Sequence, residues 1–125
     1  AKITVGELPV VPADSLQMIQ LFQNLIHNSI NYRKEKELQI HISAEELDDH
    51  WVISVKDNGK GINPNVAPHI FQMFRRGTSR QEDRGLGIGL AICKGILGRH
   101  KGEIWMESEP GLGTTFFFSL PKEAI

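Results

Sequence analysis

Four clusters rich in glycine or asparagine follow one another along the chain in a fixed order, each beside a predicted helix or strand. They are Asn24-x-x-x-Asn28, Asp57-Asn58-Gly59-Lys60-Gly61, Gly85-x-Gly87-x-Gly89 and Gly111-Leu112-Gly113-Thr114. Each cluster alone is a weak signal, because Asp-Asn-Gly can simply be a turn and glycines interrupt any loop. Together and in this order, they indicate a nucleotide pocket on a domain that mixes helices and strands.

Composition bounds the class of protein. The 125 residues, 40% of them hydrophobic, predict a single domain of the α/β or α+β class over residues 1–125. A net charge of -1 without runs of like charge disfavours a nucleic-acid binder. No apolar run approaches the roughly 18 residues of a membrane span, so we expect no membrane contact, and the single cysteine fits a reducing, cytoplasmic setting. Because the chain begins without Met, we interpret it as a fragment of a longer protein.

Hydrophobic periodicity predicts the order of helices and strands. Strands are expected at residues 3–5, 38–44, 51–55, 103–108 and 114–120, and helices at residues 14–32, 70–74 and 89–99. Residues 75–87 lack periodicity and are expected to form a loop that acts as a lid. The single cysteine, Cys93, lies in an apolar stretch and is expected to be a buried small hydrophobe.

The helix at residues 14–32 has an unusual polar face. Asp14, with Gln17 three residues later, approximates a capping box. The predicted core face comprises Leu16, Ile19, Phe22, Leu25, Ile26 and Ile30. The opposite face comprises Gln17, Gln20, Asn24, Asn28 and Asn31. Asparagine is a poor helix former, so this stripe of neutral amides suggests a surface that faces a ligand.

The chemistry of three clusters suits an adenine nucleotide. Asp57, at a strand end beside glycines, can accept a hydrogen bond from an exocyclic amine, although a turn without a ligand is the alternative. Asn28 offers a neutral oxygen to Mg²⁺, or it is a surface or core amide. Gly85, Gly87 and Gly89 lead into a helix whose amino end can bind phosphate, or they only give flexibility.

Other nucleotide and metal motifs fit worse. The glycine spacing is not that of a dinucleotide fold, Lys60 is followed by glycine rather than by the Ser or Thr of a P-loop, and the HRD and DFG signatures of protein kinases are missing. The five histidines show no metal-binding spacing.

Five sequence boxes together resemble a known family, the ATP-binding catalytic domain of sensor histidine kinases in the GHKL superfamily. They lie at residues 21–32 (N box), 57–62 (G1 box), 70–74 (F box), 85–90 (G2 box) and 111–116 (last glycine box). The sequences of these boxes are most similar to those of kinase domains that follow phytochrome or PAS-type sensors. The resemblance implies a two-layer sandwich, with a mixed sheet of about five strands covered on one face by about three helices.

The resemblance also implies roles for individual residues. Asn28 would bind Mg²⁺, Asp57 the adenine amine, Tyr32 the adenine ring, and Gly85, Gly87 and Gly89 the phosphates. Asn28 and Arg76 would take part in catalysis. The other residues expected at the ATP site are Asn24, Asn31, Gly59, Gly61, Ile62, Phe74, Leu86, Leu90 and Thr115.

Two positions differ from the pattern of related proteins. Asn31 stands where many such kinases have Lys or Arg, so Arg76, Arg80 or Arg84 would contact phosphate instead. Asn24 stands where hydrolytic members carry a general-base Glu, and an amide cannot take up a proton at neutral pH. ATP hydrolysis is therefore disfavoured relative to transfer to another acceptor.

The resemblance implies a protein histidine kinase that uses Mg-ATP. Its partners would be a separate dimerisation domain that carries the acceptor histidine and, indirectly, a response regulator. Two alternatives remain open at this point. One is a degenerate domain that binds nucleotide as a conformational switch, and the other is an anti-sigma-type serine kinase.

Overall fold

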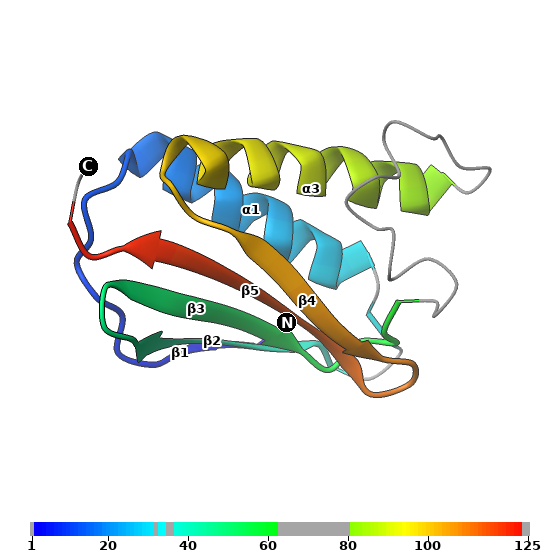
Figure 1. Ribbon diagram of the computed structural model, residues 1–125. Coiled ribbons are helices and arrows are strands. Elements are labelled where there is room, and N and C mark those ends of the chain that lie inside the picture. Colours follow the sequence, from blue (N-terminus) through cyan, green and yellow to red (C-terminus); the bar gives the residue numbers. More distant parts are fainter. Residues whose placement is uncertain (1, 32, 35–36, 63–80, 124–125) are drawn as a thin grey trace.

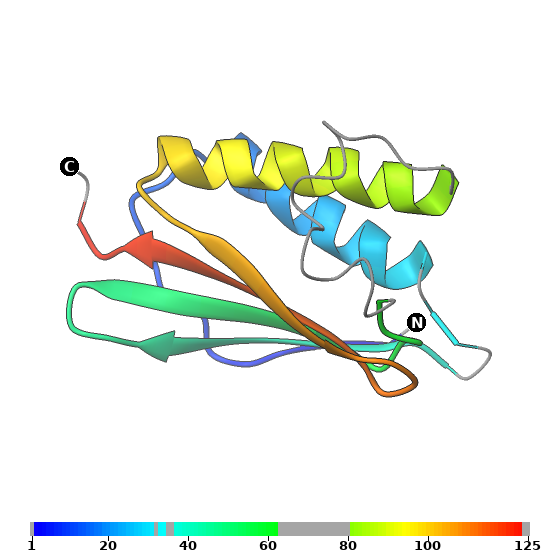
Figure 2. The same cartoon turned by 45° about the vertical axis from the view of Figure 1, so that its right-hand side comes forward.

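The computed structural model describes residues 2–31, 33–34, 37–62 and 81–123, with the side chains of the last range described from Gly89 onward. Its elements are β1 (Lys2–Val5), α1 (Ser15–Asn31), β2 (Gln39–Glu46), β3 (His50–Asp57), α3 (Gln81–Arg99), β4 (Ile104–Glu109) and β5 (Gly113–Pro121). They form two layers, in which α1 and α3 lie side by side over one face of the sheet (Figures 1 and 2).

The sheet has five strands in the order β1-β2-β3-β5-β4. β1 pairs in parallel with β2, and all other neighbours are antiparallel. This confirms the mixed five-stranded sheet, in which β2 and β3 are adjacent antiparallel strands and β1 lies at one edge. The predicted helix at residues 70–74 lies outside the described residues. β3 is the central strand, so its last residue, Asp57, lies where the middle strand of the sheet ends.

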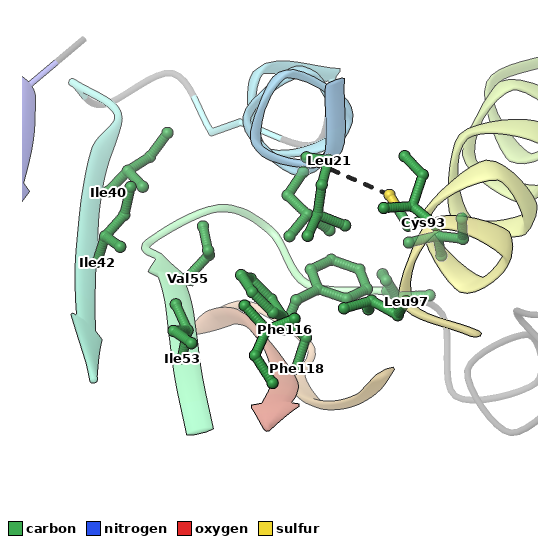
Figure 3. Packing of buried hydrophobic residues seen from close by; sticks show 14 of the residues in the cluster. Leu21, Ile40, Ile42, Ile53, Val55, Cys93, Leu97, Phe116 and Phe118 are labelled. Carbon is green, nitrogen blue, oxygen red and sulfur yellow. Dashed lines mark hydrogen bonds between the residues drawn. The ribbon is translucent and has the colours of Figure 1, made fainter. Parts of the chain in front are cut away.

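The core lies between the sheet and the two helices (Figure 3). Phe116 and Phe118 of the sheet are its largest fully buried side chains, and the Phe118 ring packs edge-on against Phe22 of α1 with centroids 5.5 Å apart. The other core residues labelled in the figure are Leu21, Ile40, Ile42, Ile53, Val55, Cys93 and Leu97. The sheet residues among them alternate along each strand, as expected for strands covered on one face.

Cys93 of α3 is buried in the core where this helix contacts α1, which confirms its interpretation as a small hydrophobe. Its thiol donates a long hydrogen bond to the Leu21 carbonyl, with S···O 3.9 Å. Burial raises the pKa of this thiol to about 12. Because the thiolate is the reactive form, Cys93 is inert at neutral pH.

α1 begins as predicted, but its core face differs from the prediction. The backbone N–H of Gln17 donates to Asp14 Oδ1 at 2.9 Å, which confirms Asp14 as the N-cap. Leu16 and Ile19, expected in the core, are 78% and 54% exposed. The buried residues of the helix are Leu21, Leu25, Asn28 and Ser29. The buried face is therefore rotated around the helix and includes part of the amide stripe.

α3 begins earlier than the sequence predicts. We expected a loop to residue 87 and a helix from residue 89, whereas α3 starts at Gln81 and ends, as predicted, at Arg99. The prediction was therefore wrong for residues 81–87, and that for residues 75–80 lies outside the described part of the chain. Gly85 and Gly87 do not prevent the early start, because a glycine inside a helix costs only about 1 kcal/mol relative to alanine. Neither described helix is apolar enough over a sufficient length to cross a membrane.

Candidate nucleotide site

One end of the candidate site is built around Asp57, the last residue of β3. The residue is 6% exposed, and its carboxylate accepts three hydrogen bonds. Oδ1 accepts the backbone N–H of Gly59 at 2.9 Å and that of Thr114 at 3.1 Å, and Oδ2 accepts the Ser29 hydroxyl at 2.8 Å. Residues from α1, the end of β3 and the start of β5 thus hold one carboxylate in a single orientation.

The two glycine clusters that flank Asp57 pack directly against each other. The Gly111 amide donates to the Lys60 carbonyl at 2.8 Å. Gly61 has φ 78°, and a Cβ there would lie only 2.6 Å from the Glu109 carbonyl oxygen. Gly113 has φ 136°, and a Cβ there would collide with the carbonyl oxygen of Asp57. Glycine is therefore required at residues 61 and 113 because two backbones meet there.

Asn24 and Asn28 form the other end of the candidate site. They lie one turn apart on α1, with Asn28 buried and Asn24 half-buried. Both side chains face Gly89 of α3. A Cβ added at Gly89 would lie 3.7 Å from the amide oxygen of Asn24 and 3.8 Å from that of Asn28. Neither buried amide nitrogen has a hydrogen-bond partner in the described part of the structure. Since buried amides are normally satisfied, this pair is suited to a polar ligand beside Gly89.

The remaining predicted residues have varied positions. Gly59, Gly61 and Ile62 are buried in the segment after β3, and Leu90 is a core residue of α3. Asn31 is exposed at the end of α1. Gly85, Leu86 and Gly87 belong to α3, within the helix rather than ahead of its amino end. Tyr32, Phe74, Arg76 and Arg80, and the side chains of Arg84 and Leu86, lie outside what the structure describes.

Two contacts of Asp57 come from residues that lie in the predicted boxes but were not assigned a role at the site. Thr114 supplies a backbone N–H, whereas Thr115, which was predicted, pairs with Lys56 in the sheet. Ser29 follows Asn28 directly and is 1% exposed. A serine inside a helix usually bonds its own helical backbone, so a hydroxyl adjacent to a predicted ligand-binding residue was the only signal.

The arrangement suits binding better than proton transfer. Asp57 can accept a hydrogen bond from an amine, and the amide oxygens of Asn24 and Asn28 can accept hydrogen bonds or coordinate a cation. No group of three or more His, Cys, Asp or Glu residues that could hold a metal occurs among the described residues. Mg²⁺ fits this donor set, because in nucleotide sites it takes few protein ligands and is completed by phosphate and water oxygens.

Comparison with known sequences gives matches over nearly the whole chain. The model of the family described as "Histidine kinase-, DNA gyrase B-, and HSP90-like ATPase" matches residues 13–124. Cyanobacterial phytochrome A of Nostoc sp. strain PCC 7120 is 53% identical over 121 residues, which is 97% of this chain and 16% of that protein. The chain thus spans about a sixth of the length of this relative.

Solved structures share the fold. The catalytic domain of histidine kinase ThkA has a TM-score of 0.76 at 30% identity, over 97% of this chain and 77% of that one. Full-length ShkA in complex with AMPPNP has a TM-score of 0.78 at 25% identity, over 99% of this chain and 26% of that one.

Proposed function

The chain belongs to the family of histidine kinase-, DNA gyrase B- and HSP90-like ATPases, and from this premise we propose that it is the catalytic domain of a sensor histidine kinase. In this proposal it binds Mg-ATP and transfers the γ-phosphoryl group to a histidine on a separate dimerisation domain, from which a response regulator receives it. The site would work in the cytoplasm, where ATP is available.

The buried, pre-oriented carboxylate of Asp57 is the observation that carries the proposal. A carboxylate is only an acceptor, so it matches the 6-amino group of adenine and not the 6-oxo group of guanine. The ShkA structure, which shares this fold, was solved with the ATP analogue AMPPNP. We infer that the adenine of ATP contacts Asp57 and that its phosphates extend toward Asn28 and Gly89.

The two asparagines support phosphoryl transfer rather than hydrolysis. Asn24 lies one turn before Asn28 on the same helix, and its amide cannot deprotonate a water molecule. An acceptor histidine needs no such base, because its neutral imidazole nitrogen attacks the γ-phosphorus while the bond from phosphorus to the ADP oxygen breaks. Positioning and charge neutralisation then account for catalysis, and bound Mg²⁺ would supply the latter at the phosphate oxygens.

The test of this proposal is a phosphoryl-transfer assay with labelled ATP. The chain alone should remain unlabelled, because the transfer needs an acceptor held about 3–3.5 Å from phosphorus in line with the leaving oxygen. Addition of the cognate dimerisation domain should place acid-labile phosphate on its histidine. Acid-stable label on the partner would indicate a serine kinase, and acid-labile label on the isolated chain would also overturn the proposal.

Replacing Asn28 with alanine should remove the contribution of Mg²⁺ to ATP affinity. We expect roughly a tenfold loss of affinity in the presence of Mg²⁺, about 1.4 kcal/mol, and little change for adenosine, because only the phosphate end loses a ligand. Titration calorimetry with and without Mg²⁺ measures both values. Gln23→Ala, an exposed amide on the same helix, is the matched control. An equal loss for ATP and adenosine would contradict a metal-binding role for Asn28.

A further inference from the structure

The Asp57 carboxylate has few acceptor positions left for a ligand. A carboxylate offers about four lone-pair positions, two on each oxygen. The N–H groups of Gly59 and Thr114 occupy those of Oδ1, and the Ser29 hydroxyl occupies one on Oδ2. One position therefore remains, on the oxygen that Ser29 contacts.

The Ser29 hydroxyl is itself held firmly. Its oxygen lies 2.8 Å from Asp57 Oδ2 and 3.3 Å from the carbonyl oxygen of Leu25, one turn earlier on α1. The hydroxyl has one proton, and the shorter contact, to a charged acceptor, is the stronger one. Leu25 is fully buried in the core, so the orientation of Oδ2 is tied to the packing of α1.

We propose that Ser29 is a positioning residue that sets the specificity of the site for a 6-aminopurine. It orients Oδ2 so that the remaining lone pair meets one amine hydrogen, an inference that rests on adenine binding at Asp57 as proposed above. The two contacts of Oδ1 fix only one oxygen. Without the hydroxyl, rotation of the carboxylate about the Cβ–Cγ bond costs less free energy. Oδ2 can then turn toward other hydrogen-bond donors.

Substitution of Ser29 should therefore change selectivity without unfolding the domain. Alanine is smaller than serine and is the best helix former, and Oδ1 keeps both of its backbone donors. The loss of affinity should be largest for a nucleotide whose amino group contacts Oδ2. A purely structural role would instead weaken binding of every nucleotide to the same extent.

The experiment compares ATP with purine riboside triphosphate, which lacks the 6-amino group. Affinities are measured for the wild type, Ser29→Ala and a control, Ser43→Ala. Ser43 shares a hydrogen bond of the same length, 2.8 Å, with Ser54, but lies on the sheet face opposite the helices. In Ser29→Ala we expect the preference for ATP to fall roughly three- to tenfold, mainly through weaker ATP binding. Ser43→Ala should keep the wild-type preference.

Each result has a distinct meaning. If the wild type prefers ATP and Ser29→Ala keeps that preference, the role of Ser29 is overturned while adenine binding at Asp57 stands. If the wild type itself shows no preference, adenine recognition at Asp57 fails and this inference fails with it. Ser29→Cys replaces the hydroxyl with a weak donor of similar shape, so its preference should lie between those of the wild type and Ser29→Ala, and a preference below that of Ser29→Ala would overturn the role of the hydrogen bond.

Discussion

Replacing Asp57 with asparagine is expected to weaken ATP binding roughly 5- to 150-fold, about 1–3 kcal/mol, while the domain stays folded. The amide oxygen of the new side chain can still accept the N–H groups of Gly59 and Thr114. Its NH₂ group then takes the place of Oδ2, where it can donate to the Ser29 oxygen while the Ser29 proton turns to the Leu25 carbonyl. The fold loses little, but two donors now face each other at the adenine amine.

Calorimetric titration with Mg-ATP measures this effect. Asp49→Asn is a matched control, since it makes the same chemical change in an exposed loop. There, the hydrogen bond from His50 lowers the pKa of Asp49, so the control also removes a paired carboxylate. Unchanged ATP affinity in a folded Asp57→Asn variant would exclude Asp57 from the site.

Replacing Gly113 with alanine should have the largest effect on stability, a loss of about 2–4 kcal/mol in the free energy of unfolding. The backbone there has φ 136°, which side chains disfavour, and the new Cβ would collide with the Asp57 carbonyl. Relief of that collision must move the first residues of β5 away from β3. The Thr114 N–H would move with them, so we also expect weaker ATP binding.

Gly111 offers a matched control for Gly113 in the same turn. Its φ of 84° is also positive, but no atom lies within 4 Å of the position of an added Cβ. Gly111→Ala should therefore cost only the backbone penalty, about 1–2 kcal/mol. Urea denaturation measures the free energy of unfolding of both variants. The difference between their losses gives the contribution of the collision with Asp57, apart from that of the positive φ. Equal losses in the two variants would show that the contact with Asp57 contributes nothing.

The sequence predicted most elements of the fold because their periodicity is clear. The five strands, the start of α1 and the end of α3 were each expected within a few residues. The core face of α1 was not, because Phe22, Leu25 and Ile26 fit either of two overlapping faces. Packing against the sheet selected the face that contains Leu21 and Ser29, and a helical pattern alone does not contain that information.

The candidate site was predictable where side-chain chemistry marks it. Asp57 and Asn28 were identified because a carboxylate at a strand end and an amide stripe are unusual. Gly59 and Thr114 lie in the predicted clusters, but their role as N–H donors to Asp57 was not predictable, since every residue except proline has an N–H and only the fold decides which are brought close. Likewise, Gly85 and Gly87 lower the helix propensity of residues 81–87, and only the tertiary structure shows that this segment is helical.

The bonds of Asp57 also have a consequence for the order of folding. Its partner Ser29 lies 28 residues earlier in the chain, and Thr114 lies 57 residues later. The carboxylate is therefore oriented only after the first helix and the last hairpin have both docked, which are slow, non-local events. In the binding mode proposed above, partly folded chains should bind adenine poorly, so nucleotide would act on the complete native state. Mass action then stabilises the whole domain at once, by about 2.7 kcal/mol when free ATP is a hundred times its dissociation constant.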